Sequence, residues 1–314
     1  MALDHYVSQV YLKNFYSPDL GELMHAIKKS DLKYFTPNSD SVCRIEKGNS
    51  NPFLSEERII EEFLQTIEPY YNRAVDEILN RKFDNNTLYT IAGFVAYIQT
   101  CSPTGVRISQ NHLKTMVEDA SKVIDKQGKI PSPPEELGGK TFTELLNSGE
   151  VKIQVDQKYP QALGISGIMS SLAVFANCHW DIIINEYEDN SFFTSDFPIG
   201  QELSSNPIII NKIFPLRPNV AIRIRPHENI NTENPDYTFS KFKYRFAKVS
   251  RNDIVNINRL LVRCAEDMVF FNKNHDWISP FIKKNSKFFI KPQVYEVPAV
   301  KGKYKLFTSR VVEK

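Results

Sequence analysis

Residues 161–178, with the sequence QALGISGIMSSLAVFANC, are apolar nearly all round and are followed at once by a segment of different periodicity. An apolar surface on every side predicts a helix buried at the centre of the fold. Before this segment, apolar residues recur at helical spacing, whereas after it they follow strand patterns. Helices first and mostly antiparallel strands afterwards, with no clean linker between them, predict an α+β fold.

Three more helices are predicted ahead of this segment. A long amphipathic helix is expected from Ser55, a candidate N-cap, to about residue 80, with a kink or break near Pro69. Two others are expected at about 87–100 and 108–126. Near the N-terminus, residues 5–15 predict a short helix or strand, and the apolar runs flanking KKSD (28–31) predict a hairpin.

The pattern after residue 178 predicts a sheet and a closing helix. Strands are expected in HWDIIINEY, FFTSDFP, IIINKIFPL, VAIRIRP, YTFSKFKYRFAKV and MVFFN, and helices at about 250–266 and 275–285. We therefore expect one α+β domain over residues 1–290, with a helical part at about 55–178 and a sheet part at about 179–272. Residues 291–314 are expected to form a basic C-terminal tail, extended at best.

The charge of the 314-residue chain is unevenly distributed. The net charge is only +2, but residues 283–314 contain nine Lys or Arg and two acids, so this segment is +7 and the rest is −5. A polyanion partner and a merely solvated extension both fit this asymmetry. The segment therefore raises a nucleic-acid hypothesis without deciding it.

Cysteine spacing and hydropathy predict a cytoplasmic protein. The four cysteines are far apart and form no CxxC, so a zinc ribbon or disulfide scaffold is not expected, and buried thiols in a reducing compartment fit better. Residues 1–12 lack the pattern of a secretory signal. No apolar run approaches the roughly 18 residues of a membrane span. The pattern gives no oligomeric state.

No P-loop, GxGxxG, HExxH or GxSxG motif is present, so function must be sought in weaker local signals. The first is DHYVSQVYLKNF at 4–15, which sets His5, Gln9 and Lys13 among large apolar residues. His5 is a candidate base or metal ligand, with Gln9 and Lys13 orienting a substrate. The alternative is a half-buried histidine held by a carbonyl and a lysine whose stem covers apolar surface.

Two further signals involve carboxylates. Glu61 and Glu68 fall on one stripe beside the apolar face of the 55–80 helix, where they either face a cleft and bind a cation or lie on solvated surface. In TSDFP (194–198), Ser195 and Asp196 stand where a strand ends, a common place for active-site carboxylates. The alternative for Asp196 is an Asx-turn that caps backbone amides.

The fourth signal is alternation of basic residues in two predicted strands. Lys241, Lys243 and Arg245 share one face of their strand, and Arg223 and Arg225 share one face of theirs. Together they predict either a phosphate-binding surface or the soluble outer face of a half-buried sheet. The aromatic residues between them are expected to pack inward, so a base-stacking platform is not expected.

Taken together, these stretches resemble one family. HYVSQVYLKNF is similar to the N-terminal HYVPxxYLxxF motif of the DUF4238 proteins, and FFTSDFPI is similar to their SDxP motif. TIEPYYNRAVDEI, YIQTCSP and INRLLVRCAEDMVFF resemble other segments of that family. Ser8 stands where the family usually has Pro, and Cys101 and Ser102 replace an Arg-Thr pair, which leaves Arg107 as the candidate to substitute for that Arg.

The family name records a domain of unknown function, so the resemblance implies no reaction. It implies instead that polar residues on its motif positions share one site. These are His5, Gln9, Tyr11, Lys13, Glu68, Gln99 and Asp196.

The leading hypothesis is a cytoplasmic hydrolase, most plausibly a metal-dependent nuclease or other phosphodiester-cleaving effector of a defence or toxin system. His5, Lys13 and Asp196 would be catalytic, and Glu68 and Asp196 would bind Mg²⁺ or Mn²⁺. The expected substrate-binding residues are Gln9, Tyr11, Gln99, Ser195, Arg223, Arg225, Lys241, Lys243 and Arg245.

The alternative hypothesis is a non-catalytic nucleic-acid-binding or interaction protein. In this case the polar residues of the motifs form a structural network that holds the N-terminal element on the rest of the fold.

Overall fold

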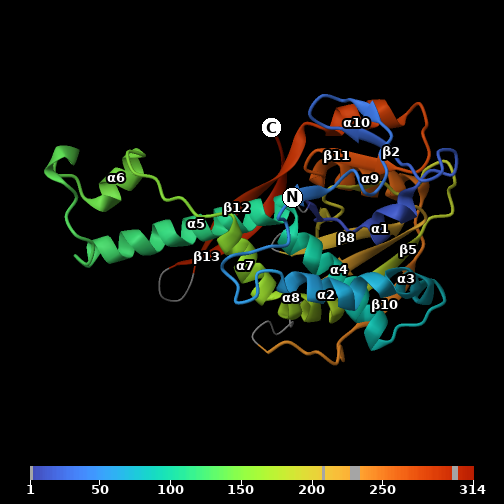
Figure 1. Ribbon diagram of the computed structural model, residues 1–314, viewed down its shortest axis with the longest axis horizontal. Coiled ribbons are helices and arrows are strands. Elements are labelled where there is room, and N and C mark those ends of the chain that lie inside the picture. Colours follow the sequence, from blue (N-terminus) through green and yellow to red (C-terminus); the bar gives the residue numbers. More distant parts are fainter. Residues whose placement is uncertain (1–2, 207–208, 227–233, 299–302) are drawn as a thin grey trace.

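A computed structural model describes residues 3–206, 209–226, 234–298 and 303–314 (Figure 1). The chain has the α+β fold that the sequence predicts, with mostly antiparallel sheets. Its N-terminal part contains short elements only. They are β1 (Leu3–His5), α1 (Gln9–Leu12), the 3-10 helix η1 (Lys13–Phe15), β2 (His25–Lys28), β3 (Tyr34–Phe35) and β4 (Arg44–Glu46).

The N-terminal strands are each fixed by a partner distant in sequence. β1 pairs with β4 in antiparallel fashion. The predicted hairpin is confirmed as β2 and β3, and β11 (Met268–Phe271) pairs with the free edge of β2. β6 (Thr194–Ser195) then pairs with β11, which gives the order β3-β2-β11-β6. This small sheet therefore joins the first and last thirds of the chain.

The helical part follows the predicted pattern, with shifted ends. The break at Pro69 is confirmed, because the 3-10 helix η2 (Glu68–Tyr70) separates α2 (Ile59–Ile67) from α3 (Tyr71–Leu79). The first helix begins at Ile59 and not at Ser55. α4 (Asn85–Cys101) leads directly to α5 (Pro103–Lys126), whose start is set by Ser102, an N-cap that accepts a hydrogen bond from the Gly105 amide. The 3-10 helix η3 (Glu135–Leu137) and α6 (Phe142–Ser148) follow, and α5 with α6 projects away from the body (Figure 1).

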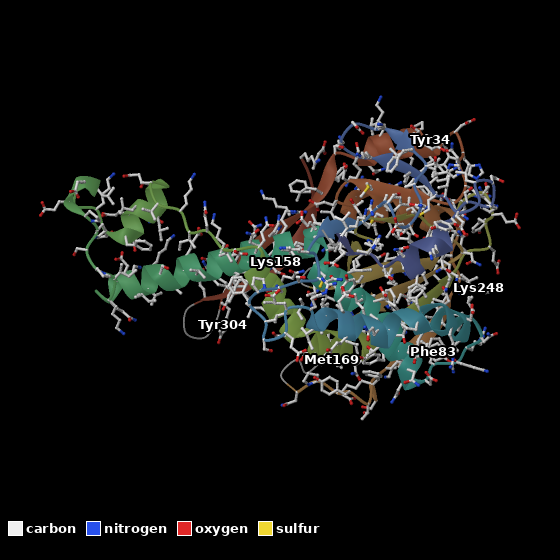
Figure 2. The ribbon with its side chains drawn as sticks, viewed as in Figure 1. Tyr34, Phe83, Lys158, Met169, Lys248 and Tyr304 are labelled. Carbon is white, nitrogen blue, oxygen red and sulfur yellow. The ribbon has the colours of Figure 1, made fainter. Side chains whose placement is uncertain are left out.

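The single buried helix predicted over 161–178 is not observed. Two helices, α7 (Lys158–Ser166) and α8 (Ile168–Ala176), meet at Gly167. Each of these helices has one exposed side and one buried side. Leu163 of α7 and Met169 of α8 are exposed, and Figure 2 shows Met169 at the outer surface. Leu172 of α8 is buried and packs against α4 near Gly93. Glycine lowers helix propensity and so favours the break.

A five-stranded sheet forms the centre of the molecule, in the order β10-β5-β9-β8-β7. β10 is parallel to β5 and the other pairs are antiparallel. The first residue of the strand predicted at 208–216, Ile208, lies outside the described residues. The strand predicted over 192–198 shortens to β6. The members of the large sheet are β5 (His179–Ile184), β7 (Gly200–Leu203), β8 (Ile210–Arg217), β9 (Val220–Arg225) and β10 (Lys243–Ala247).

The two faces of this sheet are covered differently. One face carries Trp180, Phe214 and Ile222, which join the main core with side chains of α3, α4 and α8. The other face is apolar at one end, where Ile213 and Ala221 pack under α9 (Arg251–Cys264). At its other end, by the two-residue alternation of the strands, it carries charged side chains. The N-cap of α9 is Ser250, which forms a capping box with Asp253.

The basic C-terminal segment is a hairpin and not an extended tail. After α10 (Ile278–Asn285), strand β12 (Phe288–Pro298) pairs along its whole length with β13 (Lys303–Glu313). The predicted boundary at residue 291 falls inside β12. Several of the basic side chains are paired with acids, such as Lys305 with Asp119, whereas Lys301 lies outside the described residues. Within the described ranges, no helix combines the length and hydropathy needed to cross a membrane.

Candidate functional site

Three of the residues that the sequence assigns to one site lie together in the structure. His5, Gln9 and Glu68 line a cavity of about 260 Å³ between β1, α1 and α2–η2. Arg58, Asn49 and further side chains complete it. The full lining is Leu3, Asp4, His5, Ser8, Gln9, Val10, Asn49, Arg58, Glu61, Leu64 and Glu68. We call this the His5 pocket.

Backbone pairing and a buried tyrosine hold His5 in place. β1 ends at His5, whose carbonyl accepts a hydrogen bond of 2.6 Å from the Tyr97 hydroxyl on α4. The His5 ring lies 3.2 Å (Nε2) from the Asp40 carbonyl oxygen. α1 is anchored by Tyr11, which is fully buried and stacks on Phe214 of the central sheet at 5.1 Å between ring centroids. The buried side chain of Tyr11 therefore helps to position Gln9 in the pocket.

Much of the charge in the His5 pocket is already paired. Arg58 donates to Asp4 and to Glu61, each at 3.0 Å, and Asn49 donates to Glu61 at 2.7 Å. Burial works to raise the pKa of Asp4, but hydrogen bonds from Arg58 and the Asn49 amide hold it below its usual value. This part of the pocket is a stabilising network of the kind that the alternative hypothesis predicts.

Glu68 is the exception in this network. Burial raises the pKa of its carboxyl above the ordinary value, a hydrogen bond with Ser8 and the charge of His5 oppose the rise, and the charge of Glu61 adds to it. A half-buried carboxyl with a raised pKa next to a histidine is an arrangement suited to acid–base chemistry. Neither Lys13 nor Tyr11 lines the pocket: Lys13 is exposed, and the Tyr11 hydroxyl hydrogen-bonds with Thr194 at 2.6 Å.

Asp196 is buried elsewhere, away from the lining of the His5 pocket. Its carboxylate accepts hydrogen bonds from the backbone amides of Glu266, Asp267 and Met268, at 2.9, 2.8 and 2.8 Å. Burial raises its pKa to about 6 although these three donors lower it. Asp196 thus caps the turn between α9 and β11, and Ser195 accepts from the Phe197 amide. Asp196 therefore does cap backbone amides, but these amides lie about 70 residues away, so the contacts are long-range and are not a local Asx-turn.

The predicted metal-ligand pair is not assembled in the structure. Both oxygens of Asp196 accept backbone amides and the residue is 3% exposed, so it does not fit the part of a ligand shared with Glu68. In the part of the chain that the structure describes, no three His, Cys, Asp or Glu side chains are grouped closely enough to hold a metal ion.

The predicted basic residues form a cluster around a carboxylate that the sequence pattern did not single out. Asp181 lies at the centre of β5 with its side chain 1% exposed. Arg245 of β10 donates to it at 2.6 Å and Arg225 of β9 at 2.8 Å, while Arg223 lies 3.5 Å away. The three arginines reach it from both neighbouring strands, because residues 223 and 245 are each in register with Asp181.

This cluster keeps an excess of positive charge. Arg223 also pairs with Glu202 of β7 at 2.8 Å, and Lys243 lies in register with His179 next to the arginines. We define the arginine face as His179, Asp181, Glu202, Arg223, Arg225, Lys243 and Arg245; its charged groups sum to +2 with His179 neutral.

The arginine side chains of this face are held in place by Asp181. Burial, opposed by hydrogen bonding and the arginine charges, leaves the pKa of Asp181 below its ordinary value, so this carboxylate stays ionised and fixes the guanidinium groups. The Arg225 Nε atom is buried without a hydrogen-bond partner among the described residues, and the Arg245 side chain is 58% exposed. Lys241 is not part of the face, because β10 begins two residues after it.

Gln99 lies in a different cavity, beside the C-terminal hairpin, with Gln201 and Lys212. Arg107, considered above as a substitute for the missing family Arg, pairs with Glu266 at 2.7 Å and donates to the Ile290 carbonyl. Its guanidinium is therefore engaged in holding β12 and the α9–β11 turn.

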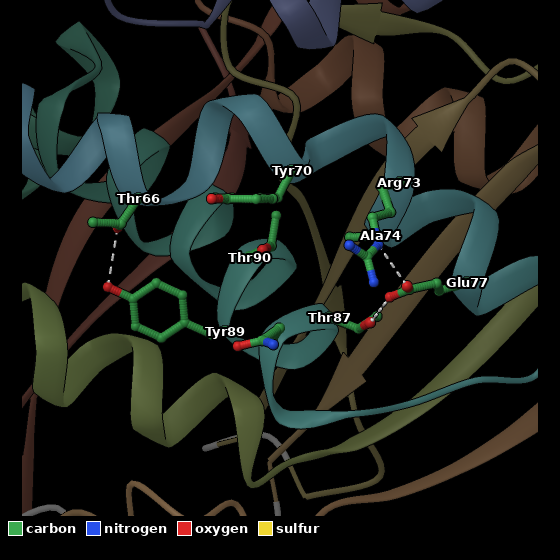
Figure 3. A pocket seen from close by; sticks show the side chains of 9 residues that line it. Thr66, Tyr70, Arg73, Ala74, Glu77, Thr87, Tyr89 and Thr90 are labelled. Atoms are coloured by element: carbon green, nitrogen blue, oxygen red, sulfur yellow. Dashed lines mark hydrogen bonds and ion pairs between the residues drawn. The ribbon is translucent and has the colours of Figure 1, made fainter.

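Another cavity, of about 470 Å³, lies between η2–α3 and α4 and contains none of the predicted site residues (Figure 3). Several of its polar groups are paired with one another: Arg73 donates to Glu77 at 2.8 Å, Glu77 accepts from Thr87, and Thr66 and Tyr89 share a hydrogen bond. The Arg73 side chain is 73% exposed, so this is a surface groove whose charged side chains, Arg73 and Glu77, pair with each other.

Sequence reasoning missed two residues that matter in these sites, Asp181 and Lys212. Each is a charged residue inside an otherwise apolar strand, in HWDIII and IIINKIF. This pattern could have been used to predict both residues from the sequence, because a charged side chain in an apolar strand requires a partner or a ligand.

The family comparison covers the region in which these sites lie. A family model described as "Protein of unknown function (DUF4238)" matches residues 4–275, which include the arginine face and all of the His5 pocket except Leu3, but not the β12–β13 hairpin. No curated protein and no solved structure matches the chain significantly. On the strength of a match that covers most of its length, the chain belongs to the DUF4238 family.

Proposed function

We propose that this chain binds a phosphate-bearing polyanion, with nucleic acid as the leading partner, on the arginine face. The observation that carries the proposal is the convergence of Arg223, Arg225 and Arg245 on the single buried carboxylate of Asp181, with Lys243 beside them. Three guanidinium groups exceed what one carboxylate neutralises, and fixed guanidinium forks match phosphate oxygens.

Contact with the phosphate backbone, and not with bases, fits the surface. The aromatic residues of β10 lie on the opposite side of the strand, where Tyr244 stacks on Phe83 at 3.9 Å between centroids. Bases would therefore find no aromatic platform beside the arginines, which favours a duplex whose bases stay stacked. The four buried free cysteines fit a reducing compartment, so we place the partner inside the cell.

The test is a binding titration of labelled duplex DNA followed by fluorescence anisotropy. Lys243→Glu reverses a charge on the face without removing a partner of Asp181, and should weaken binding by about 10-fold at low salt. Arg245→Gln should weaken it as well, with Arg223 and Arg225 still holding Asp181. Lys126→Glu, the same charge reversal at the exposed end of α5, is the matched control and should bind like the parent protein. Equal affinities for all three variants would refute the arginine face.

A second candidate function is hydrolysis of phosphodiesters at the His5 pocket, as an effector of a defence or toxin system. It is favoured by one observation, the raised pKa of Glu68 beside His5. Glu68 would act as acid or base, and His5 would activate water.

Incubation of the protein with DNA or RNA, with Mg²⁺ or Mn²⁺ and with EDTA, tests this second candidate. His5→Ala and Glu68→Gln should abolish cleavage and leave the melting temperature nearly unchanged. A lowered melting temperature in a protein that never cleaves would instead assign both residues to the structural network.

A further inference from the structure

A second polar cavity lies under the C-terminal hairpin and is independent of the two sites above. Its volume is about 270 Å³, at the small end for metabolite sites. It is walled by α4 and α5, by strands β7 and β8, and by β13. The lining residues are Gln99, Gly105, Ile108, Ser109, His112, Phe197, Gln201, Ile210, Lys212, Phe307, Thr308 and Ser309.

Two amide oxygens in this cavity lack donors. Gln201 donates from Nε2 to the Ser309 hydroxyl at 2.8 Å, but its Oε1 is buried with no hydrogen-bond partner among the described residues. The Oε1 atom of Gln99 is in the same condition. A buried carbonyl oxygen without a donor is costly, so the pair of oxygens favours a ligand with N–H or O–H groups.

Lys212 adds a positively charged group to the lining of this cavity. It is directly opposite Gln201 in the β7–β8 register, so the two side chains project from the same face of the sheet. The described residues offer its ammonium group neither an ion pair nor a hydrogen bond; it has only the Phe175 ring, 5.7 Å away. Burial lowers the pKa of Lys212, and the charges of the Cys178 and Cys264 thiolates would oppose this.

Those thiols do not provide the missing counter-ion. Burial raises the pKa of Cys178 to about 12 and that of Cys264 to about 11, so both are neutral near pH 7. A half-buried ammonium group without a counter-ion attracts an anion strongly, because the surrounding dielectric constant is low.

The remaining walls define the shape of the ligand. His112 lies 2.8 Å (Nε2) from the Thr308 carbonyl, so Nε2 carries its proton and Nδ1 is an acceptor in the neutral ring. Burial lowers the pKa of His112, which keeps the ring neutral. Phe197 and Phe307 add apolar surface.

We infer that this cavity binds a small anion carrying N–H donors, with its carboxylate or phosphate on Lys212 and its N–H groups on the Oε1 atoms of Gln99 and Gln201. Two kinds of metabolite share this chemistry, an amino acid and a nucleoside monophosphate. The cavity is closed on one side by β13, so a polymer does not fit the same description.

The experiment uses the full chain and measures its thermal unfolding midpoint and calorimetric binding. The probes are AMP, GMP, CMP, UMP, L-glutamate, L-glutamine and inorganic phosphate, each at about 5 mM. At least one organic probe should raise the midpoint by roughly 2–4 °C. A shift with a nucleoside monophosphate would identify phosphate as the anionic group of the ligand, and a shift with an amino acid would identify carboxylate. No shift with any organic probe would overturn the inference.

Lys212→Met is the decisive variant, because it keeps the length of the side chain and removes its charge. It should weaken the effective probe at least about 10-fold while the ligand-free protein is as stable as the parent or more so, since an unpaired buried charge is lost. Lys248→Met, at an exposed lysine, is the control and should bind normally. Unchanged affinity in Lys212→Met would contradict the assignment.

This result is separable from the polyanion proposal. Lys212→Met should bind duplex DNA like the parent protein, and Lys243→Glu should bind the small probe like the parent protein. Either proposal can therefore be refuted while the other still holds.

Discussion

Asp196 and Asp181 are both buried carboxylates, but their partners differ in kind. Asp196 accepts three backbone amides from the turn after α9, whereas Asp181 is held by arginine side chains from two strands. The backbone amides that donate to Asp196 hold the conformation of the turn, and their N–H groups are used in these bonds and are not free to bind a ligand. Arginines in excess retain donors and charge that a ligand can use. Both carboxylates are buried, so it is the kind of hydrogen-bond partner that separates their roles. We infer a structural role for Asp196 and a place in a candidate binding site for Asp181.

Replacing Asp196 with Asn should destabilise the protein without a specific loss of ligand binding. The amide NH₂ group would face at least one backbone donor, so the free energy of unfolding should fall by about 2–4 kcal/mol. Urea unfolding measures this. Asp276→Asn, at an exposed aspartate, should change stability by less than about 0.5 kcal/mol. Normal stability in Asp196→Asn, combined with lost cleavage of nucleic acid, would return Asp196 to a catalytic role.

The raised pKa of Asp196 also predicts a pH dependence. Its pKa is about 6 in the folded protein against an ordinary value of 3.8, so the folded state binds more protons between these values. The stability contribution of this group is therefore full below about pH 4 and is lost as the pH rises through about 6. The loss of stability in Asp196→Asn should accordingly be larger at pH 4.5 than at pH 7.5, measured by urea unfolding at both. A difference that grows with pH would contradict the assigned shift.

At the level of residues, the family resemblance predicted part of the site. It places His5, Gln9 and Glu68 among the polar residues expected to share one site, and those three residues do share a cavity. The partners of Asp196 and Asp181 were not predictable in this way. Each depends on strand pairing between segments far apart in sequence, which no local pattern specifies.

The β12–β13 hairpin is the element whose role differs most from its sequence pattern. Ile290 is 1% exposed in the core, its carbonyl accepts from Arg107, and the Phe288 carbonyl accepts from the buried Lys29 at 3.0 Å. These contacts join the hairpin to α5 and to the small N-terminal sheet. The frequent lysines made the alternating pattern of β12 hard to recognise in the sequence. An antiparallel strand can have one face on the core and one in solvent, so only every second residue of β12 needs to be apolar.

Ile290→Ala should therefore cost about 2–4 kcal/mol of unfolding free energy, the usual loss for a large apolar side chain removed from a core. Val297→Ala, at a half-buried position near the far end of β12, should cost less than about 1 kcal/mol. Chemical denaturation of the two variants makes the comparison. If both substitutions are neutral, the segment is a detached tail and the hairpin contacts contribute nothing.

Elements with strong local signals were predicted well and those set by packing were not. The Pro69 break and the β2–β3 hairpin follow from short-range chemistry and are observed. Residues 161–178 break into α7 and α8 at Gly167, and α8 then packs on α4. Composition alone could not distinguish one buried helix from two half-buried ones.

For the whole molecule, the central sheet separates the candidate sites. α1, which carries Gln9, packs through Tyr11 on the Phe214 face, whereas Asp181, Arg223 and Arg245 lie on the other face. The predicted single site, with His5 as catalyst and the basic strands holding the substrate, is not what this arrangement favours. Binding at the arginine face and chemistry at the His5 pocket are better treated as separate properties.

The most direct measurement of the central proposal is the salt dependence of duplex DNA binding. If three or four cationic side chains of the arginine face contact phosphates, a plot of log K against log salt should have a slope between about −2 and −4. Lys243→Glu should reduce the magnitude of that slope by about 1, and Lys126→Glu should leave it unchanged. A slope near zero, or one that Lys243→Glu does not alter, would contradict the account.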